Sequence, residues 1–167
     1  MTRSTFLIAL WLVLWSVARA DAQQATPRLG SPMEPFVARF GPPFRANGTV
    51  QDFDKCPGRS AEARWSVMFE DGKAISIWRG TCGGAKHAIA EARRDAMRFF
   101  PPDAVRGKPF VTENGEEAER YVSQTLGKTL APRHFENCDS KPVTRGTFLY
   151  VLSAEKTYWS IVAGLCP

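Results

Sequence analysis

The four cysteines, with the two stretches that end on them, constrain this chain more than any other feature. Residues 65–82 and 146–166 each contain two apolar runs around a charged tip, and each ends on a cysteine. Each final cysteine has a partner upstream at nearly the same distance, 26 residues in one case and 28 in the other: Cys56 and Cys82, and Cys138 and Cys166. The matched pattern predicts an internal duplication, or tandem repeat, in a small exported domain.

An even number of cysteines in an exported chain favours disulfides. We predict one bridge within each of the two cysteine pairs, although four cysteines permit three pairings. A zinc site is the alternative, but the chain has no C-x-x-C pair and its two histidines, His87 and His134, are far apart. We therefore expect no metal and no cofactor.

The first 20 residues predict a secretory signal peptide that is cleaved after Ala20 or Ala22. Arg3 supplies the basic start, residues 6–18 form an apolar core of 13 residues, and small residues surround the cleavage point. A retained membrane anchor is the alternative, but a spanning helix needs roughly 20 apolar residues. We therefore expect a secreted or periplasmic protein with no stable membrane insertion after the signal is removed.

Charge and length limit the classes of function. Cleavage after Ala20 leaves 20 basic and 17 acidic residues, a formal charge of +3, and this mild excess supports no nucleic-acid partner. We expect the partner to be a protein in the exported compartment. About 145 residues remain, enough for one domain. We expect a flexible leader over residues 21–30 and a single disulfide-bonded domain over 31–167.

Local patterns predict two helices and several strands in this domain. Residues 31–43 predict a short helix that is capped by Ser31 and ended by a Gly-Pro-Pro run. Residues 85–102 predict an amphipathic helix, because small and apolar residues recur at helical spacing. Strands are predicted over residues 48–56, over residues 119–126 and in both cysteine-ended hairpins.

The Asp71-Gly72 dipeptide favours a two-residue turn and so predicts the register of the first hairpin. Counting outward from the turn places Trp65 opposite Trp78 on one face of the hairpin. In the closing hairpin the turn is less well defined, and similar counting places Tyr150 opposite Trp159. Each hairpin would then have one aromatic face and one mostly aliphatic face.

Together these elements predict an α+β fold. Two αβββ repeats, about 31–84 and about 85–167, form one antiparallel sheet with both helices packed on one face. This element order, exported and with a disulfide in each half, resembles the fold of the β-lactamase-inhibitor protein family. The FVARFGPP helix ending is similar to the short helical starts of BamE-type envelope domains. The first resemblance implies binding to an exported enzyme, and no functional residue is transferred from either family.

The chain contains no recognisable catalytic motif, so we do not expect an enzyme. Cys82 lies five residues before His87, but a catalytic cysteine must be a free thiolate and a disulfide is the better explanation here. The glycines near Cys82 lack the Gly-Lys-Ser/Thr sequence of a phosphate loop. The acidic run at 113–119 contains carboxylates, the groups that catalyse glycoside hydrolysis, but charge runs are usually solvated loops. A small secreted hydrolase is therefore the third hypothesis.

Four aromatic residues are the candidate binding residues: Trp65, Trp78, Tyr150 and Trp159. Core packing is the alternative explanation for each of them. A sheet covered by helices on one side leaves its other face to water, and Trp and Tyr often anchor protein interfaces. We therefore predict a non-catalytic binding module, one form of which is an inhibitor of an exported enzyme. The second hypothesis is an envelope assembly or structural factor. As binding residues, the four aromatics would lie on the helix-free face and be partly accessible.

Overall fold

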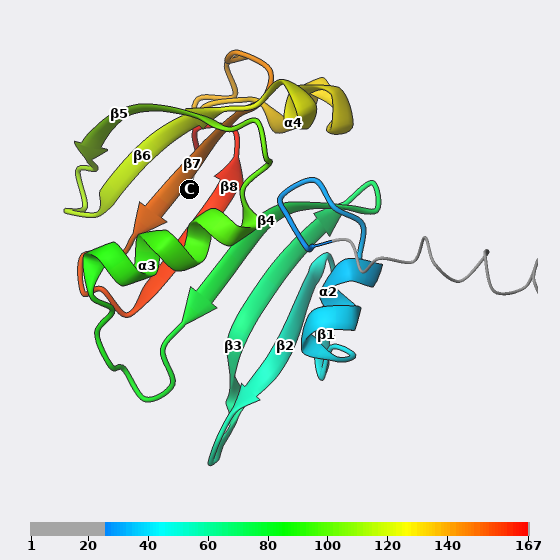
Figure 1. Cartoon of the computed structure of the whole chain (residues 1–167), viewed down its shortest axis with the longest axis vertical. Coiled ribbons are helices and arrows are strands. Elements are labelled where there is room, and N and C mark those ends of the chain that lie inside the picture. The colour runs from blue at the N-terminus through cyan, green and yellow to red at the C-terminus, as the bar shows by residue number, and fades with distance from the viewer. Residues whose placement is uncertain (1–25, 167) are drawn as a thin grey trace, which may run out of the picture.

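A single antiparallel sheet of eight strands, in the order β1-β2-β3-β4-β8-β7-β6-β5, forms the body of the protein (Figure 1). The computed structural model describes residues 26–166, so the predicted signal peptide and the first part of the leader lie outside the described residues. The strands are β1 (Arg45–Asn47), β2 (Val50–Cys56), β3 (Arg59–Glu70), β4 (Lys73–Gly80), β5 (Val105–Val111), β6 (Glu117–Val122), β7 (Thr147–Leu152) and β8 (Tyr158–Ala163). The helices are α2 (Glu34–Phe40), α3 (Ile89–Ala96) and α4 (Gln124–Thr129), with 3-10 turns η1 (Met97–Phe99) and η2 (Pro132–His134).

The two halves of the chain have similar element orders and meet in the middle of the sheet. A helix followed by four strands occurs first as α2 and β1–β4, and then as α3 and β5–β8, with α4 and η2 between β6 and β7. The last strands of the two halves, β4 and β8, pair with each other. Each half therefore has four strands, not the three that the sequence predicted, because β1 and β5 were not foreseen. The internal duplication itself stays a prediction.

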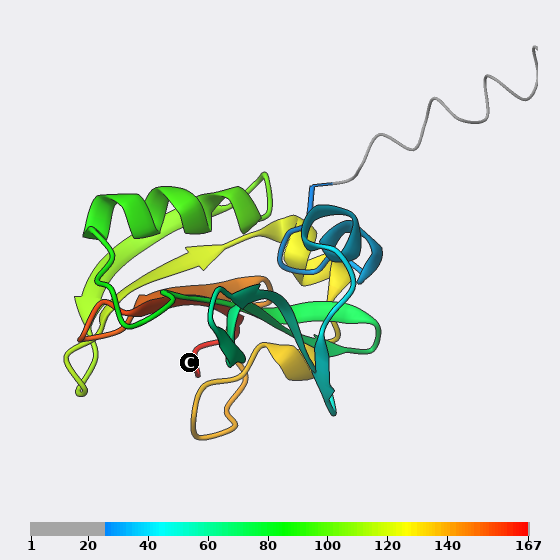
Figure 2. The same cartoon turned by 90° about the horizontal axis from the view of Figure 1, so that it is seen from below.

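Helices α2 and α3 cover the same face of the sheet, which we call the helix face (Figure 2). Phe36 of α2 and Ala92 and Ala96 of α3 belong to one buried cluster with aromatic and aliphatic side chains from β2, β3, β4, β7 and β8. Burial of this cluster is the main source of folding free energy in a domain of this size.

We call the opposite face the open face. Among the described residues, the short turn η2 is the only helical element on it. The connection between α4 and β7 passes below this face (Figure 2). It is held there by backbone bridges, one of which joins Asn137 to Leu165. A small second cluster of Ala118, Leu149 and Val151 packs here against Val162 and Leu165.

Both predicted disulfides are confirmed. The Cα atoms are 5.4 Å apart in Cys56–Cys82 and 4.8 Å apart in Cys138–Cys166. The first bridge joins the end of β2 to the residues after β4, although β3 lies between these strands. The β2–β3 register shifts between Lys55 and Cys56, with the extra residues on β3, and a bulge of this kind bends the strand that carries it.

At the amino end, two predictions differ from the structure. Residues 26–30 are not a free leader, because Leu29 is buried and its backbone N–H donates to the carbonyl of Phe99 at 2.8 Å. Ser31 does not cap α2. The residue before that helix is Met33, and the Ser31 hydroxyl accepts from the backbone N–H of Arg28 at 3.0 Å.

In the second half, the strand predicted over 119–126 is only partly correct. Strand β6 ends at Val122, and α4 begins at Gln124. The Ser123 hydroxyl accepts from the backbone N–H of Leu126 at 3.0 Å, which is the N-cap interaction that starts a helix. The amphipathic helix predicted over 85–102 is shorter, since α3 starts at Ile89 and gives way to η1 after Ala96.

Candidate binding surface

Three of the four candidate aromatics lie in the core, and the expectation that they would be accessible on the helix-free face is wrong. Trp65 is 6% exposed, Tyr150 is 3% exposed and Trp159 is 0% exposed, all on the helix face. The Trp65 ring lies 4.9 Å from Phe40, 5.0 Å from Phe99 and 5.6 Å from Trp159, measured between ring centroids. Aromatic rings of α2 and η1, Phe40 and Phe99, therefore pack against the aromatic face of the sheet.

Trp78 is different, because a bulge puts it on the other face. The Asp71-Gly72 turn forms as predicted, with positive φ at both residues, and next to it Glu70 pairs with Lys73 and Phe69 pairs with Ala74. The register then shifts between Met68 and Phe69, so that Trp65 pairs with Arg79 and not with Trp78. One extra residue reverses the side on which every later side chain emerges. Trp78 therefore lies on the open face, half-buried.

In the closing hairpin the predicted pairs are shifted by two residues, which leaves the faces unchanged. Tyr150 pairs with Ile161, and Trp159 pairs with Leu152. Because the shift is even, Tyr150 and Trp159 remain on a common face as predicted.

The immediate neighbours of Trp78 on the open face are short. Ser66 is paired with it on β3, and Ser160 is paired with it on β8. The Ser66 hydroxyl donates to a carboxylate oxygen of Asp52 at 2.6 Å. No large side chain stands directly opposite the indole on either adjacent strand.

A cavity of about 490 Å³ lies beside Trp78, between the open face and the connection held by Cys138–Cys166. Its apolar wall comes from half-buried side chains of the sheet: Met68, Ile75, Trp78 and Val162. Its polar rim comes from the hairpin tip and the connection: Glu70, Arg133, His134, Glu136 and Asn137. An apolar floor with a polar rim is the usual composition of a protein-binding patch.

Ion pairs fix one end of this cavity. The Asp71 carboxylate at the tip of the β3–β4 hairpin accepts a hydrogen bond from Arg133. His134 Nε2 lies 3.4 Å from the same carboxylate oxygen. The hydrogen bond from Arg133 holds the pKa of Asp71 below its usual range. The hairpin tip and η2 are thereby joined across the rim.

The other candidate groups of the sequence have structural explanations. Cys82 is disulfide-bonded, so it offers no thiolate to His87. Of the acidic run at 113–119, Glu119 is buried and ion-paired. Within residues 26–166, no group of three His, Cys, Asp or Glu side chains could hold a metal ion. The helices of this described part are all too short or too polar to cross a membrane.

Comparison with protein-family models, with curated proteins and with solved structures gave no match to this chain. The resemblances in element order to β-lactamase-inhibitor proteins and to BamE-type domains therefore stay predictions.

Proposed function

We propose that this protein is an exported, non-catalytic binding module that holds a partner protein against the open face of its sheet. The position of Trp78 carries the proposal. It is the one member of the four candidates that is half-buried on the helix-free face, between two serines and beside an apolar cavity. A tryptophan in such a position is the residue type most often found at the energetic centre of a protein interface.

The compartment supports this assignment. Two disulfides favour an oxidising extracellular or periplasmic location. The second disulfide also positions the connection that forms one wall of the cavity beside Trp78. A wall held covalently loses less conformational entropy on binding than a free loop does. Inhibition of an exported enzyme is one activity that this arrangement suits.

The test is a comparison of two alanine variants. Cross-linking in the exported fraction of the source cells identifies the partner, and calorimetry with purified partner measures its affinity. Trp78→Ala should weaken binding by about 2 kcal/mol, or about 30-fold. Met97→Ala is the matched control, because Met97 is an exposed apolar side chain on η1, away from the open face.

Two results would overturn the proposal. One is a partner that binds wild type and Trp78→Ala equally. The other is turnover of a cell-wall or peptide substrate by the purified protein that is lost when a single polar residue is changed, since that would favour the hydrolase hypothesis.

A further inference from the structure

A second cavity, unrelated to the open face, lies on the helix face at the far end of the sheet. Helix α3 stands over β7 and β8, and a space of about 630 Å³ remains between this helix and the strands β5 and β6. Volumes of this size are typical of small-molecule sites. Three exposed apolar groups lie at the rim: Ile89 on α3, and Pro109 and Val111 on β5, which are paired with Glu119 and Glu117 of the helix face. Exposed apolar groups gathered around a cavity mark a place where an apolar ligand is held.

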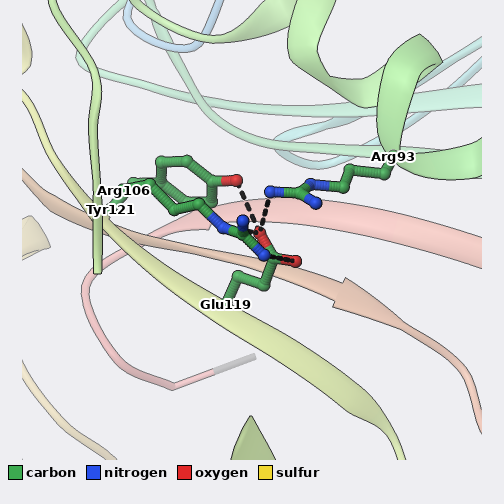
Figure 3. A network of polar contacts seen from close by, with 4 residues as sticks. All are labelled: Arg93, Arg106, Glu119 and Tyr121. Atoms are coloured by element: carbon green, nitrogen blue, oxygen red, sulfur yellow. Dashed lines mark hydrogen bonds and ion pairs between the residues drawn. The ribbon is translucent and has the colours of Figure 1, made fainter. Parts of the chain in front are cut away.

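A buried carboxylate organises the polar wall of this cavity (Figure 3). Glu119 accepts from Arg106 Nε at 3.0 Å and Arg106 Nη2 at 2.8 Å, and from the Tyr121 hydroxyl at 2.6 Å. Arg93 Nη2 of α3 lies 3.1 Å from the same carboxylate. Three of these four contacts fall on Oε2 and one on Oε1, so Glu119 is held by groups of the protein.

Two groups of the same wall have no partner. The hydroxyl of Tyr150 is buried without a hydrogen bond, and so is Nε of Arg93. Both side chains line the cavity, and Tyr150 is paired with Glu119 across β6 and β7. Burial raises the pKa of the Tyr150 phenol, which therefore stays protonated and able to donate. A buried polar group without a partner destabilises the folded protein, so two at one wall require an explanation.

The charged residues that line the cavity are Arg93, Glu117 and Glu119. Arg106 and Lys156 pair with the two carboxylates from outside the lining, with Lys156 Nζ 3.9 Å from Glu117. The balance of these five groups is one positive charge, and the two groups that lack partners are both donors.

We propose that this groove binds a small amphipathic carboxylate. Its carboxylate accepts hydrogen bonds from Tyr150 and Arg93, and its apolar body lies between Ile89, Pro109 and Val111. A peptide that adds a strand to the neighbouring sheet edge fits less well. The edge strand β5 contains Pro109 and a register shift between Arg106 and Pro109, and both features interrupt the backbone hydrogen bonds that strand addition needs.

Titration calorimetry of the oxidised protein with decanoate, below its micelle concentration and at neutral pH, tests the proposal. Decanoate should bind with one site per chain. Acetate, which lacks the apolar body, should not bind measurably. Decyltrimethylammonium, which has the same tail and the opposite charge, should bind at least about ten-fold more weakly.

Variants then locate the site. Tyr150→Phe should weaken decanoate binding by about ten-fold without lowering stability, because the lost hydroxyl has no partner within the protein. Val111→Ala should also weaken it, since Val111 is exposed at the rim. Tyr158→Phe is the control. It removes a hydroxyl that lies 3.3 Å from Glu116, outside the groove, and should leave the affinity unchanged.

The proposal is overturned if wild type does not bind decanoate, or if Tyr150→Phe and Val111→Ala bind it as wild type does. Equal binding of decanoate and decyltrimethylammonium would also overturn it, because binding would then depend on the tail alone. Trp78→Ala should retain decanoate binding, so that failure of this site and failure of the proposed protein interface are distinguishable.

Discussion

Arg106 on β5 donates two hydrogen bonds to Glu119 on β6, although the backbone partner of Arg106 is Tyr121. The guanidinium therefore reaches along the sheet, past the register shift between Arg106 and Pro109. One side-chain contact thus joins the edge strand to its neighbour where the ladder is irregular. Bidentate pairs of this kind are among the stronger hydrogen bonds in proteins.

The first prediction concerns this contact. Glu119→Gln removes the charge that Arg93, Arg106 and Tyr121 share, and it should lower the free energy of unfolding by about 2 kcal/mol. Urea denaturation measures the change. Glu113→Gln, an exposed position in the same acidic run, should change stability by no more than about 0.5 kcal/mol. Equal stability of the two variants would mean that the network adds nothing to folding.

The two tryptophans that lie on opposite faces should respond differently to truncation. Trp159 is fully buried, so Trp159→Ala should cost roughly 3–5 kcal/mol of stability. Trp78 is half-buried, and Trp78→Ala should cost less than about 2 kcal/mol. Thermal and urea unfolding of both variants test this before any partner is known. A Trp78→Ala variant as unstable as Trp159→Ala would make Trp78 a core residue.

Gly146 is required for close packing between α4 and β7. Its φ is +86°, and a Cβ at this position would overlap the carbonyl oxygen of Ser123. Gly48 also has positive φ, +57°, but nothing lies within 4 Å of its missing Cβ. Gly48→Ala should cost about 1 kcal/mol from backbone strain alone. Gly146→Ala should cost at least about 2 kcal/mol more, measured by urea unfolding. Similar costs for both would show that α4 moves away without penalty.

His87 should make stability depend on pH. Burial, followed by the charge of Arg79, lowers its pKa in the folded protein, while Asp95 and Glu91 oppose the shift. The unfolded chain, with an ordinary pKa of about 6.5, then binds the proton more readily than the folded one. The contribution to stability is complete above about pH 6.5 and is lost as pH falls below that value toward the lower folded pKa. Unfolding free energies of wild type and His87→Asn at pH 7.5 and pH 5 measure it. An equal loss in both proteins would assign the pH dependence to other groups.

The sequence predicted the presence of α2, α3, both hairpins and both disulfides, because each depends on local patterns, but it did not predict α4 or the register of either hairpin. Asp71-Gly72 determines a turn through its own backbone preferences, and this turn is confirmed. The cysteine pairing followed from compartment and spacing. The turn preference and the cysteine spacing can both be read from the sequence without knowledge of the fold.

Features that depend on distant contacts were not predictable. Nothing local marks the shift at Met68, yet that shift moves Trp78 to the open face and changes the candidate site. Strand β5 was missed because it is exposed along its whole length and so lacks an alternating pattern. The burial of Glu119 could not be inferred, because its partner Arg93 comes from a helix that only the fold brings near.

The placement of the disulfides has a consequence for how the chain behaves when it is cut. One bridge closes within residues 56–82 and the other within 138–166, so neither crosses from one half to the other. Lys86 lies exposed in the connection between β4 and α3. A single tryptic cut there would leave two fragments with no covalent link, each retaining its own bridge. They would associate only through the β4–β8 pairing and the shared core, which makes this chain suited to fragment complementation.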